Sequence, residues 1–145
     1  MCKNCKGKTK NKIIVLSDKG TSTQLSVTND NELEVEHKLI DGCAIVVGER
    51  CDHYLKIYNN QDVSHLFVEL KGSDVEKAVK QIVTTLKSGV INVGAKEKKH
   101  GAIVSTRNPL NSTETNRLKK KILLSDGVNL HFYKMKAQQK ITSFT

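Results

Sequence analysis

Short apolar runs separated by turn residues dominate the first half of the chain. Such runs, bounded by Asn, Asp and Gly residues, are typical of β-strands. The clearest alternation lies in residues 33–40, where Leu33, Val35, His37 and Leu39 would share one face of a strand. The pattern therefore predicts a β-meander across the middle of the chain, with strands at residues 13–17, 33–40, 43–47, 52–58 and 65–71.

Two helices are expected in the second half. Ser73 and Glu76 have the spacing of a capping box, and the apolar residues that follow recur at helical intervals. A second helix is predicted to begin at Asn111 or Ser112 and to run to about Leu124. The residues expected to face inward are Val75, Ala78, Val79, Ile82, Val83 and Leu86 in the first helix, and Thr115, Leu118 and Ile122 in the second.

Glycines close both helical patterns, and apolar segments follow them. Gly89 and Gly127 stand directly after the periodic stretches, where a helix commonly ends. The segments 101–106 and 128–135 predict two further strands. The order of meander, helix, strand, helix and strand predicts an α/β fold, in which helices pack on a mixed central β-sheet.

The two ends of the chain lack this patterning. Residues 1–12 are Lys-rich and polar, so we expect a flexible basic N-terminal arm there. Residues 18–32 are polar with weak periodicity, and a helix around Thr23–Val27 is one interpretation. Residues 137–145 are expected to form a polar, frayed tail. These expectations leave a single domain over residues 13–136.

The charge of the chain points to a polyanionic partner. The 145 residues include 24 Lys and Arg against 15 Asp and Glu, a net charge of +9. Both ends are basic, whereas residues 30–76 carry a net charge of −7. A basic protein with an acidic centre fits a polyanion-binding surface around a cation-binding site. Because only three Tyr and three Phe are present, contact with a phosphate backbone is favoured over base stacking.

Membrane insertion and secretion are not indicated. No apolar run approaches the roughly 20 residues needed to cross a bilayer. The first ten residues, MCKNCKGKTK, lack the apolar stretch of a signal peptide. We therefore expect a cytoplasmic protein without a membrane partner.

Glu69 and Lys71 carry the strongest candidate chemistry. Side chains two residues apart on a strand share a face, so these two would point the same way. Placing a carboxylate and an ammonium at the end of an apolar strand is costly unless something uses them. A divalent cation would use the carboxylate. Asp52, which opens the preceding strand, can lie beside Glu69 if those strands pair.

Asp52, followed by Glu69-Leu70-Lys71 on the next strand, resembles the motif of the PD-(D/E)XK nuclease superfamily. The order of a capped helix, strand, helix and strand after the triplet is similar to that family's core, over residues 33–135. Gln81 stands on the helix where some branches place a Gln. The resemblance implies a restriction-endonuclease-like core and a metal-dependent endonuclease that hydrolyses phosphodiester bonds in nucleic acid, with DNA preferred.

The same resemblance implies a role for each residue. Asp52 and Glu69 would ligate Mg²⁺ or Mn²⁺, with the Leu70 carbonyl completing the shell. Lys71 would position the attacking water, and Gln81 would hold the site or a backbone phosphate. Small nucleases of this kind often dimerise so that two sites address two strands, so a homodimer is an option. The basic residues expected to contact phosphates are Lys96, Lys98, Lys99, Arg117, Lys119 and Lys120.

The family usually carries a further acid on a helix ahead of the meander, and this chain predicts no helix there. Glu34, Glu36 and Asp41 are the candidates for that acid. Glu34 and Glu36 fall on the polar face of a predicted strand, where solvated side chains are the ordinary finding. Asp41 precedes Gly42, and this pair is typical of a turn.

Cysteines and histidines give weaker signals. Cys2, Cys5, Cys43 and Cys51 could together hold a Zn²⁺ ion. The apolar surroundings of Cys43 favour an ordinary small hydrophobic residue instead. The five histidines show no ligand spacing, so we assign them no chemistry.

Two other functions are compatible with the sequence. One is a catalytically silent module of the same fold that binds nucleic acid without cutting it. The other is a regulatory or inhibitor protein whose basic surface meets an acidic partner protein.

Overall fold

A computed structural model of the chain describes residues 6–17, 22–40, 52–70, 74–106 and 112–145. Its largest element is a six-stranded sheet. The strand order in it is β1 (Lys6–Thr9), β4 (Glu34–Leu39), β5 (His53–Asn59), β6 (Asp62–Leu70), β7 (Lys98–Ser105) and β8 (Val128–Lys134). The pairs from β1 to β6 are antiparallel, and β6, β7 and β8 are parallel. The predicted mixed sheet is therefore confirmed.

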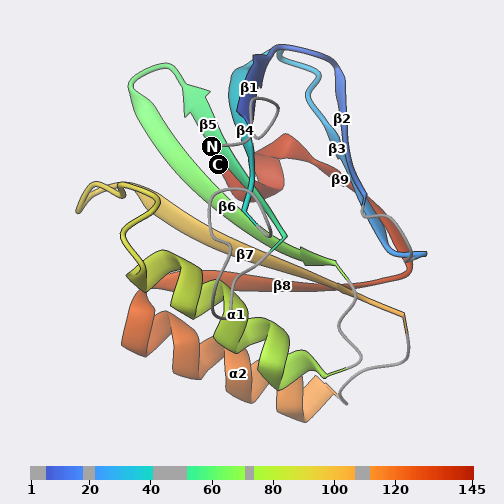
Figure 1. Cartoon of the computed structure of the whole chain (residues 1–145), viewed down its shortest axis with the longest axis vertical. Coiled ribbons are helices and arrows are strands. Elements are labelled where there is room, and N and C mark those ends of the chain that lie inside the picture. Colours follow the sequence, from blue (N-terminus) through green and yellow to red (C-terminus); the bar gives the residue numbers. More distant parts are fainter. Residues whose placement is uncertain (1–5, 18–21, 41–51, 71–73, 107–111) are drawn as a thin grey trace.

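Two helices cover one face of this sheet. Helix α1 (Val75–Lys87) connects β6 to β7, and helix α2 (Ser112–Asp126) connects β7 to β8. Figure 1 shows them side by side below the parallel strands. Both begin beyond the carboxyl ends of these strands, because a crossover between parallel strands must return the chain to the same edge.

A second, three-stranded sheet covers the other face. It consists of β2 (Ile13–Ser17), β3 (Gln24–Thr28) and β9 (Lys136–Lys140), in that order. The strands β2 and β3 are antiparallel, whereas β3 and β9 are parallel. The 3₁₀ helix η1 (Ile141–Phe144) follows β9 and also packs between the sheets. The protein thus has three layers: helices, large sheet and small sheet.

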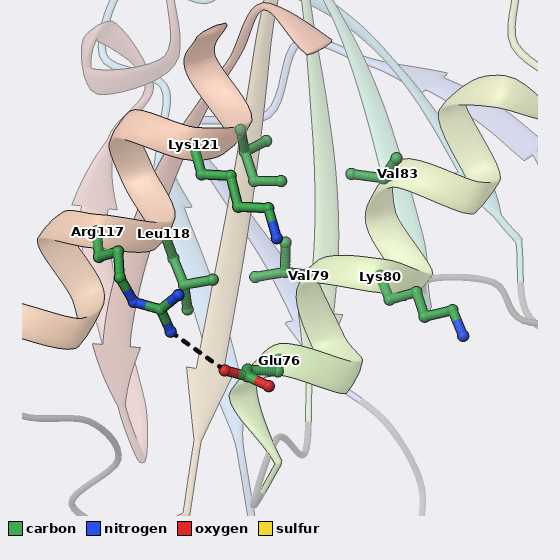
Figure 2. A pocket seen from close by; sticks show the side chains of 8 residues that line it. Glu76, Val79, Lys80, Val83, Arg117, Leu118 and Lys121 are labelled. Atoms are coloured by element: carbon green, nitrogen blue, oxygen red, sulfur yellow. Dashed lines mark hydrogen bonds and ion pairs between the residues drawn. The ribbon is translucent and has the colours of Figure 1, made fainter. Parts of the chain in front are cut away.

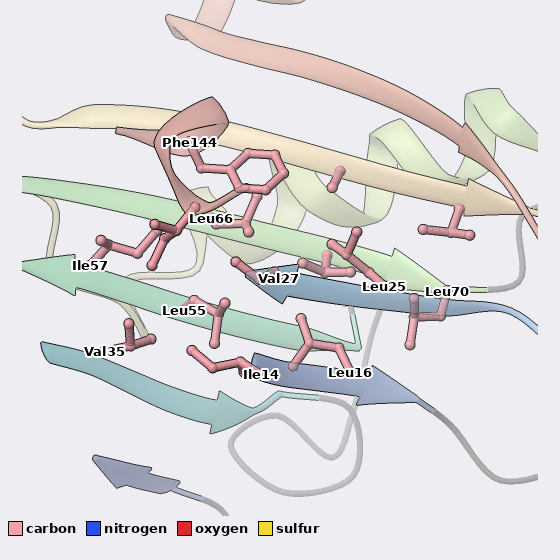
Figure 3. Packing of buried hydrophobic residues seen from close by; sticks show 14 residues of the cluster. Ile14, Leu16, Leu25, Val27, Val35, Leu55, Ile57, Leu66, Leu70 and Phe144 are labelled. Atoms are coloured by element: carbon pink, nitrogen blue, oxygen red, sulfur yellow. The ribbon is translucent and has the colours of Figure 1, made fainter. Parts of the chain in front are cut away.

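The period of two along the strands divides the core into two clusters. On β6, Leu66, Val68 and Leu70 point to the small sheet, where they pack with Phe144 (Figure 3). Phe67, between them, points to the helices. Alternation of this kind is required when both faces of a strand are buried. The sheet is therefore lined with apolar side chains on both faces.

The apolar stripe predicted for the first helix is confirmed. Val75, Ala78, Val79 and Ile82 are buried in α1. The helix approaches the sheet closely at Gly101 of β7, where an added Cβ would lie 3.3 Å from the Ile82 side chain and 2.9 Å from that of Leu130. Gly89 and Gly127 follow the two helices with positive φ angles of 80° and 68°, as expected for helix stops.

The N-cap of α1 differs from the prediction. Asp74, not Ser73, is the cap, and its side chain accepts a hydrogen bond from the Lys77 backbone N–H. The helix consequently starts one residue later than the capping-box spacing of Ser73 and Glu76 indicated. Both Ser and Asp are good caps, so the sequence left the choice between neighbouring residues open.

Three polar segments form strands that local patterning did not indicate. Residues 24–28 form β3 rather than a helix, because Leu25 and Val27 are buried on one face of the small sheet. Residues 6–9 of the expected flexible arm pair with β4. Residues 137–144 of the expected frayed tail lie in β9 and η1, and Phe144 is fully buried. In all three segments, pairing with a strand distant in the sequence outweighs the weak strand propensity of the residues themselves.

Some predictions concern residues outside the described part of the chain. These are the strand at 43–47, the turns around it, Asp41, Lys71 and the four cysteines. In the described residues, no helix has the length and apolar character required to span a membrane.

Candidate active site

Asp52 and Glu69 lie together at one edge of the large sheet. The last registered pair of β5 and β6 joins His53 to Val68. Asp52, the residue before β5, also bonds to the Val68 carbonyl through its N–H, so it lies beside the last residues of β6. Tyr54, two residues from Asp52, and Phe67, two residues from Glu69, both belong to the cluster beneath the helices. Glu69 therefore lies on the helix-facing side of β6 with Phe67.

Backbone hydrogen bonds hold Asp52 firmly at this position. Its N–H donates to the Val68 carbonyl at 3.0 Å, and its own carbonyl accepts from the Ile40 N–H at 3.0 Å. The Leu70 N–H donates to Asp52 Oδ2 at 2.8 Å. The side chain of Asp52 thus accepts the bond that would join Leu70 to the neighbouring strand. Three of the residues expected at a metal, Asp52, Glu69 and Leu70, are consequently brought together.

Both carboxylates are withdrawn from solvent. Asp52 is 5% exposed and Glu69 is 1% exposed. A divalent cation held between two neighbouring buried carboxylates would be bound by both of them. The donor set of two carboxylates and a neighbouring backbone carbonyl consists of hard oxygen atoms only, which suits Mg²⁺ or Mn²⁺. Within the described ranges no three His, Cys, Asp or Glu side chains form a metal-binding group.

The helices place two N-termini at this same edge. Since α1 starts five residues after Leu70, its first turn lies near the carboxyl end of β6. Helix α2 starts likewise after β7. Helix N-termini carry partial positive charge and favour phosphate groups. In open α/β sheets the carboxyl ends of the parallel strands are the usual place for a ligand.

Gln81 lies on the flank of α1 that points away from α2. The residues of α1 that face α2 include Val79 and Val83, whereas Gln81 is half-buried on the other side of the helix. Its backbone carbonyl accepts a hydrogen bond from the Thr85 hydroxyl at 2.8 Å. Gln81 is therefore anchored on the part of the helix layer nearer to β5.

The predicted phosphate-binding lysines before and in β7 lie away from the carboxylates. Lys98 is registered with Ser64 and Ile103 with Glu69, a separation of five residues or about 17 Å along the strand. Lys99 donates to the Asp126 carbonyl at 2.7 Å. Lys98 donates to the carbonyl of Thr145 at 3.1 Å. The structure therefore does not bring Lys98 and Lys99 to the carboxylates, and Lys96, two residues before Lys98, belongs to the same distant end.

The three predicted phosphate-binding residues of α2 lie in different environments. Arg117 forms an ion pair with Glu76 of α1 at 3.4 Å. Lys119 lies 5.9 Å from the ring centre of Phe132, which is level with Glu69 across the parallel strands. Lys120 is exposed to solvent. Lys119 is thus the predicted phosphate ligand that the register places level with the carboxylates.

The candidates for the further acid lie apart from this site. Glu34 and Glu36 lie on the face of β4 opposite to Val35, as the alternation predicted, but they are partly buried rather than fully solvated. Ile40 is the residue bonded to Asp52, so Glu36 lies four residues, or about 13 Å, farther along the strand. Glu36 instead accepts a hydrogen bond from the Tyr58 hydroxyl at 3.4 Å.

Sequence reasoning missed a buried series of hydrogen bonds on the helix-facing side of the large sheet. His65 is fully buried, and its Nδ1 lies 2.6 Å from the Tyr54 hydroxyl. Its Nε2 lies 2.7 Å from Glu97 Oε1, which also accepts from the Gly94 N–H. Because burial lowers the pKa of His65, the ring is neutral, and its Nε2–H donates to the carboxylate. The Tyr54 hydroxyl then donates to Nδ1.

The pKa values of Glu97 and Tyr54, the two partners of His65, agree with these hydrogen-bond directions. The hydrogen bonds from Gly94 and from His65 lower the pKa of Glu97, which therefore stays ionised. Burial raises the pKa of Tyr54, which keeps its hydroxyl proton. The only sequence signal for these hydrogen bonds was the alternation of side chains along a strand. It puts Tyr54 and His65 on the same face of two paired strands.

Comparisons with protein-family models, with curated proteins and with solved structures find no significant match to this chain. The geometry of the site therefore has to carry the functional argument.

Proposed function

We propose that the protein is a metal-dependent nuclease with a restriction-endonuclease-like core, and that DNA is its preferred substrate. The observation that carries the proposal is the buried pair of Asp52 and Glu69, fixed by the bond from the Leu70 N–H to Asp52. A pair of carboxylates at the carboxyl edge of parallel strands, in a protein of net charge +9, suits a cation that faces a phosphate.

Each residue then has a role in hydrolysis. Asp52, Glu69 and the Leu70 carbonyl would hold Mg²⁺ or Mn²⁺, which when bound polarises the phosphodiester and lowers the pKa of water. Lys71 follows this set directly, and its ammonium would orient the attacking water and balance charge on the phosphate. Gln81 would steady the site from α1. Lys119, on α2, would contact the substrate backbone.

The test is a cleavage screen with matched variants. The purified protein is incubated with supercoiled, linear, branched and single-stranded DNA and with RNA, in Mg²⁺, in Mn²⁺ and in EDTA. We expect cleavage that requires metal and that Glu69→Gln and Lys71→Ala abolish. Glu34→Gln is the matched control, because it removes a carboxylate from the same face of the sheet at a distance from the site.

Calorimetric titration with Mg²⁺ separates the remaining outcomes. Metal binding that Glu69→Gln abolishes, without cleavage of any substrate, would indicate the catalytically silent module that binds nucleic acid. Absence of both metal binding and cleavage, in a protein that is folded by circular dichroism, would contradict the proposal.

A further inference from the structure

A groove runs between α1 and α2 on the outer surface of the helix layer. It has a volume of about 510 Å³. Figure 2 shows that side chains from both helices line it, with Val79 and Val83 on α1 facing Leu118 on α2. The groove opens away from the sheet, so it is separate from the carboxylates of the candidate active site.

Ion pairs fix the two helices at both ends of the groove. Arg117 Nη2 lies 3.4 Å from Glu76 Oε1 near the N-terminal ends. Lys87 Nζ lies 3.4 Å from Asp126 Oδ1 near the C-terminal ends. The helices are therefore parallel to each other, which also follows from their two equivalent crossovers. A groove held at both ends is preformed, and preformed sites lower the entropy cost of binding.

The floor of the groove is apolar, and its rim carries three basic residues and one acidic residue, Glu76. Val79, Leu118 and Ile122 form the floor and are at most 7% exposed. Lys80 and Lys121 stand on the rim, and Figure 2 shows the Lys121 side chain extending across the groove towards α1. A ligand for this surface would need a narrow apolar ridge with negative charge beside it.

Leu124 is an exposed apolar residue of α2 that lies one turn beyond the groove, on the side of its basic rim. It is 88% exposed, the most exposed of the large apolar residues described. It follows Arg117 by seven residues and Lys121 by three, so it lies on the same helical stripe. Since burial of an exposed leucine is favourable, a ligand that covers Leu124 gains more from it than from the already buried floor.

We propose that this groove binds an acidic amphipathic helix of a partner protein. Such a helix presents leucine-type residues at intervals of three and four, flanked by carboxylates, and this is the usual complement of an apolar groove. Charge complementarity is the reason for this occupant. A second copy of the groove would bring one Glu and three basic residues against the same set, so two surfaces of like net charge would meet. Nucleic acid would gain nothing from Leu124 or the apolar floor.

The test uses the full chain and a synthetic peptide as the probe. The peptide is a 14-residue helix with leucines on one stripe and glutamates beside them. A peptide of the same composition with the leucines dispersed is its control. We expect NMR titration of the ¹⁵N-labelled protein to shift the amides of α1 and α2 with the first peptide only. Higher salt should weaken the binding, because the rim contacts are ionic.

Two substitutions in the groove sharpen the test. Lys121→Glu should weaken binding about tenfold, and Leu124→Ser should weaken it by a similar factor. Lys136→Glu on β9 makes the same charge change on the small sheet and should have no effect. All three residues are exposed, so the variants should remain folded.

Three results would overturn the proposal. One is the absence of groove shifts at millimolar peptide, and another is equal binding of the two peptides. The third is stronger perturbation of the same amides by a DNA duplex, which would assign the surface to nucleic acid. None of these results bears on metal-dependent cleavage, because the groove variants leave Asp52 and Glu69 in place.

Discussion

The two faces of the large sheet bury different kinds of polar side chain. The face towards the small sheet holds two histidine pairs. His37 Nε2 lies 2.9 Å from His53 Nδ1, and His100 Nδ1 lies 3.0 Å from His131 Nε2. Burial, reinforced by the partner ring, lowers the pKa of His37 and of His100 to about 4. These rings are therefore neutral near pH 7.

The face towards the helices holds acids instead. Asp52 and Glu69 are buried at its edge, and Glu97 keeps its charge by hydrogen bonding to His65. A neutral imidazole pair joins two strands at little electrostatic cost, whereas buried carboxylates are costly to retain. Under the proposed function, the small-sheet face serves stability and the helix face carries the chemistry.

The strongest test of this comparison uses two adjacent residues of β6. Glu69→Gln should lower metal-dependent cleavage about a thousandfold, since a metal contributes several kcal/mol to the transition state. Its unfolding free energy should change by less than about 1 kcal/mol, because Gln keeps the shape. Val68→Ala, on the other face, should lower the unfolding free energy by about 2 kcal/mol.

Cleavage kinetics and urea unfolding of both variants check this prediction. The activity of Val68→Ala per folded molecule should equal that of the wild type. Similar stability losses in both variants, with similar activities, would remove the functional distinction between the faces.

Phe144→Ala should destabilise the protein by about 3–5 kcal/mol, because the ring is fully buried between the sheets. Phe132→Ala removes a ring of the same size from the helix side of β8, where it is only half-buried. We expect a clearly smaller loss there. Chemical denaturation of the two variants measures the difference, and an equal or smaller loss for Phe144→Ala would show that η1 contributes little to the core.

Acid should destabilise the protein through the small-sheet face. The pKa of His37 and of His100 is about 4 in the folded chain, against an ordinary value of 6.5. The unfolded chain therefore binds more protons in this window. The unfolding free energy should fall as the pH falls from about 6.5 to about 4, by at most about 1.4 kcal/mol per pH unit for each histidine.

Denaturation across this pH range, compared with that of His100→Leu, checks the prediction. The variant should show a shallower pH dependence, because one buried histidine no longer titrates. A slope that is unchanged in His100→Leu would mean that this histidine pair does not contribute to acid sensitivity.

The smallest expected effect concerns the cap of α1. Asp74→Ala should lower the unfolding free energy by about 1 kcal/mol, because it removes the bond to the Lys77 N–H. Ser73→Ala is the control and should have little effect. Thermal unfolding of both variants decides between the two caps, and a larger loss for Ser73→Ala would favour the capping box that the sequence spacing indicates.

The sequence predicted those elements that can be recognised from the local pattern of apolar and polar side chains alone. Residues 13–17, 33–40 and 52–58 alternate or are uniformly apolar, and α1 has a continuous apolar stripe, so their identity follows from local periodicity. The pairing of 52–58 with 65–71 was the condition for Asp52 to lie near Glu69, and β5 and β6 do pair. The residue types proposed for the site were therefore visible without the fold.

Tertiary structure alone decided the remaining features. The segments QLSVT and KAQQK have little strand propensity of their own, and they become β3 and β9 by pairing across more than 100 residues of chain. The histidine pairs and the contact of His65 with Glu97 likewise join residues from separate strands and loops. Since local patterns report which face of an element is apolar but not which element covers it, only the folded chain determined these partners.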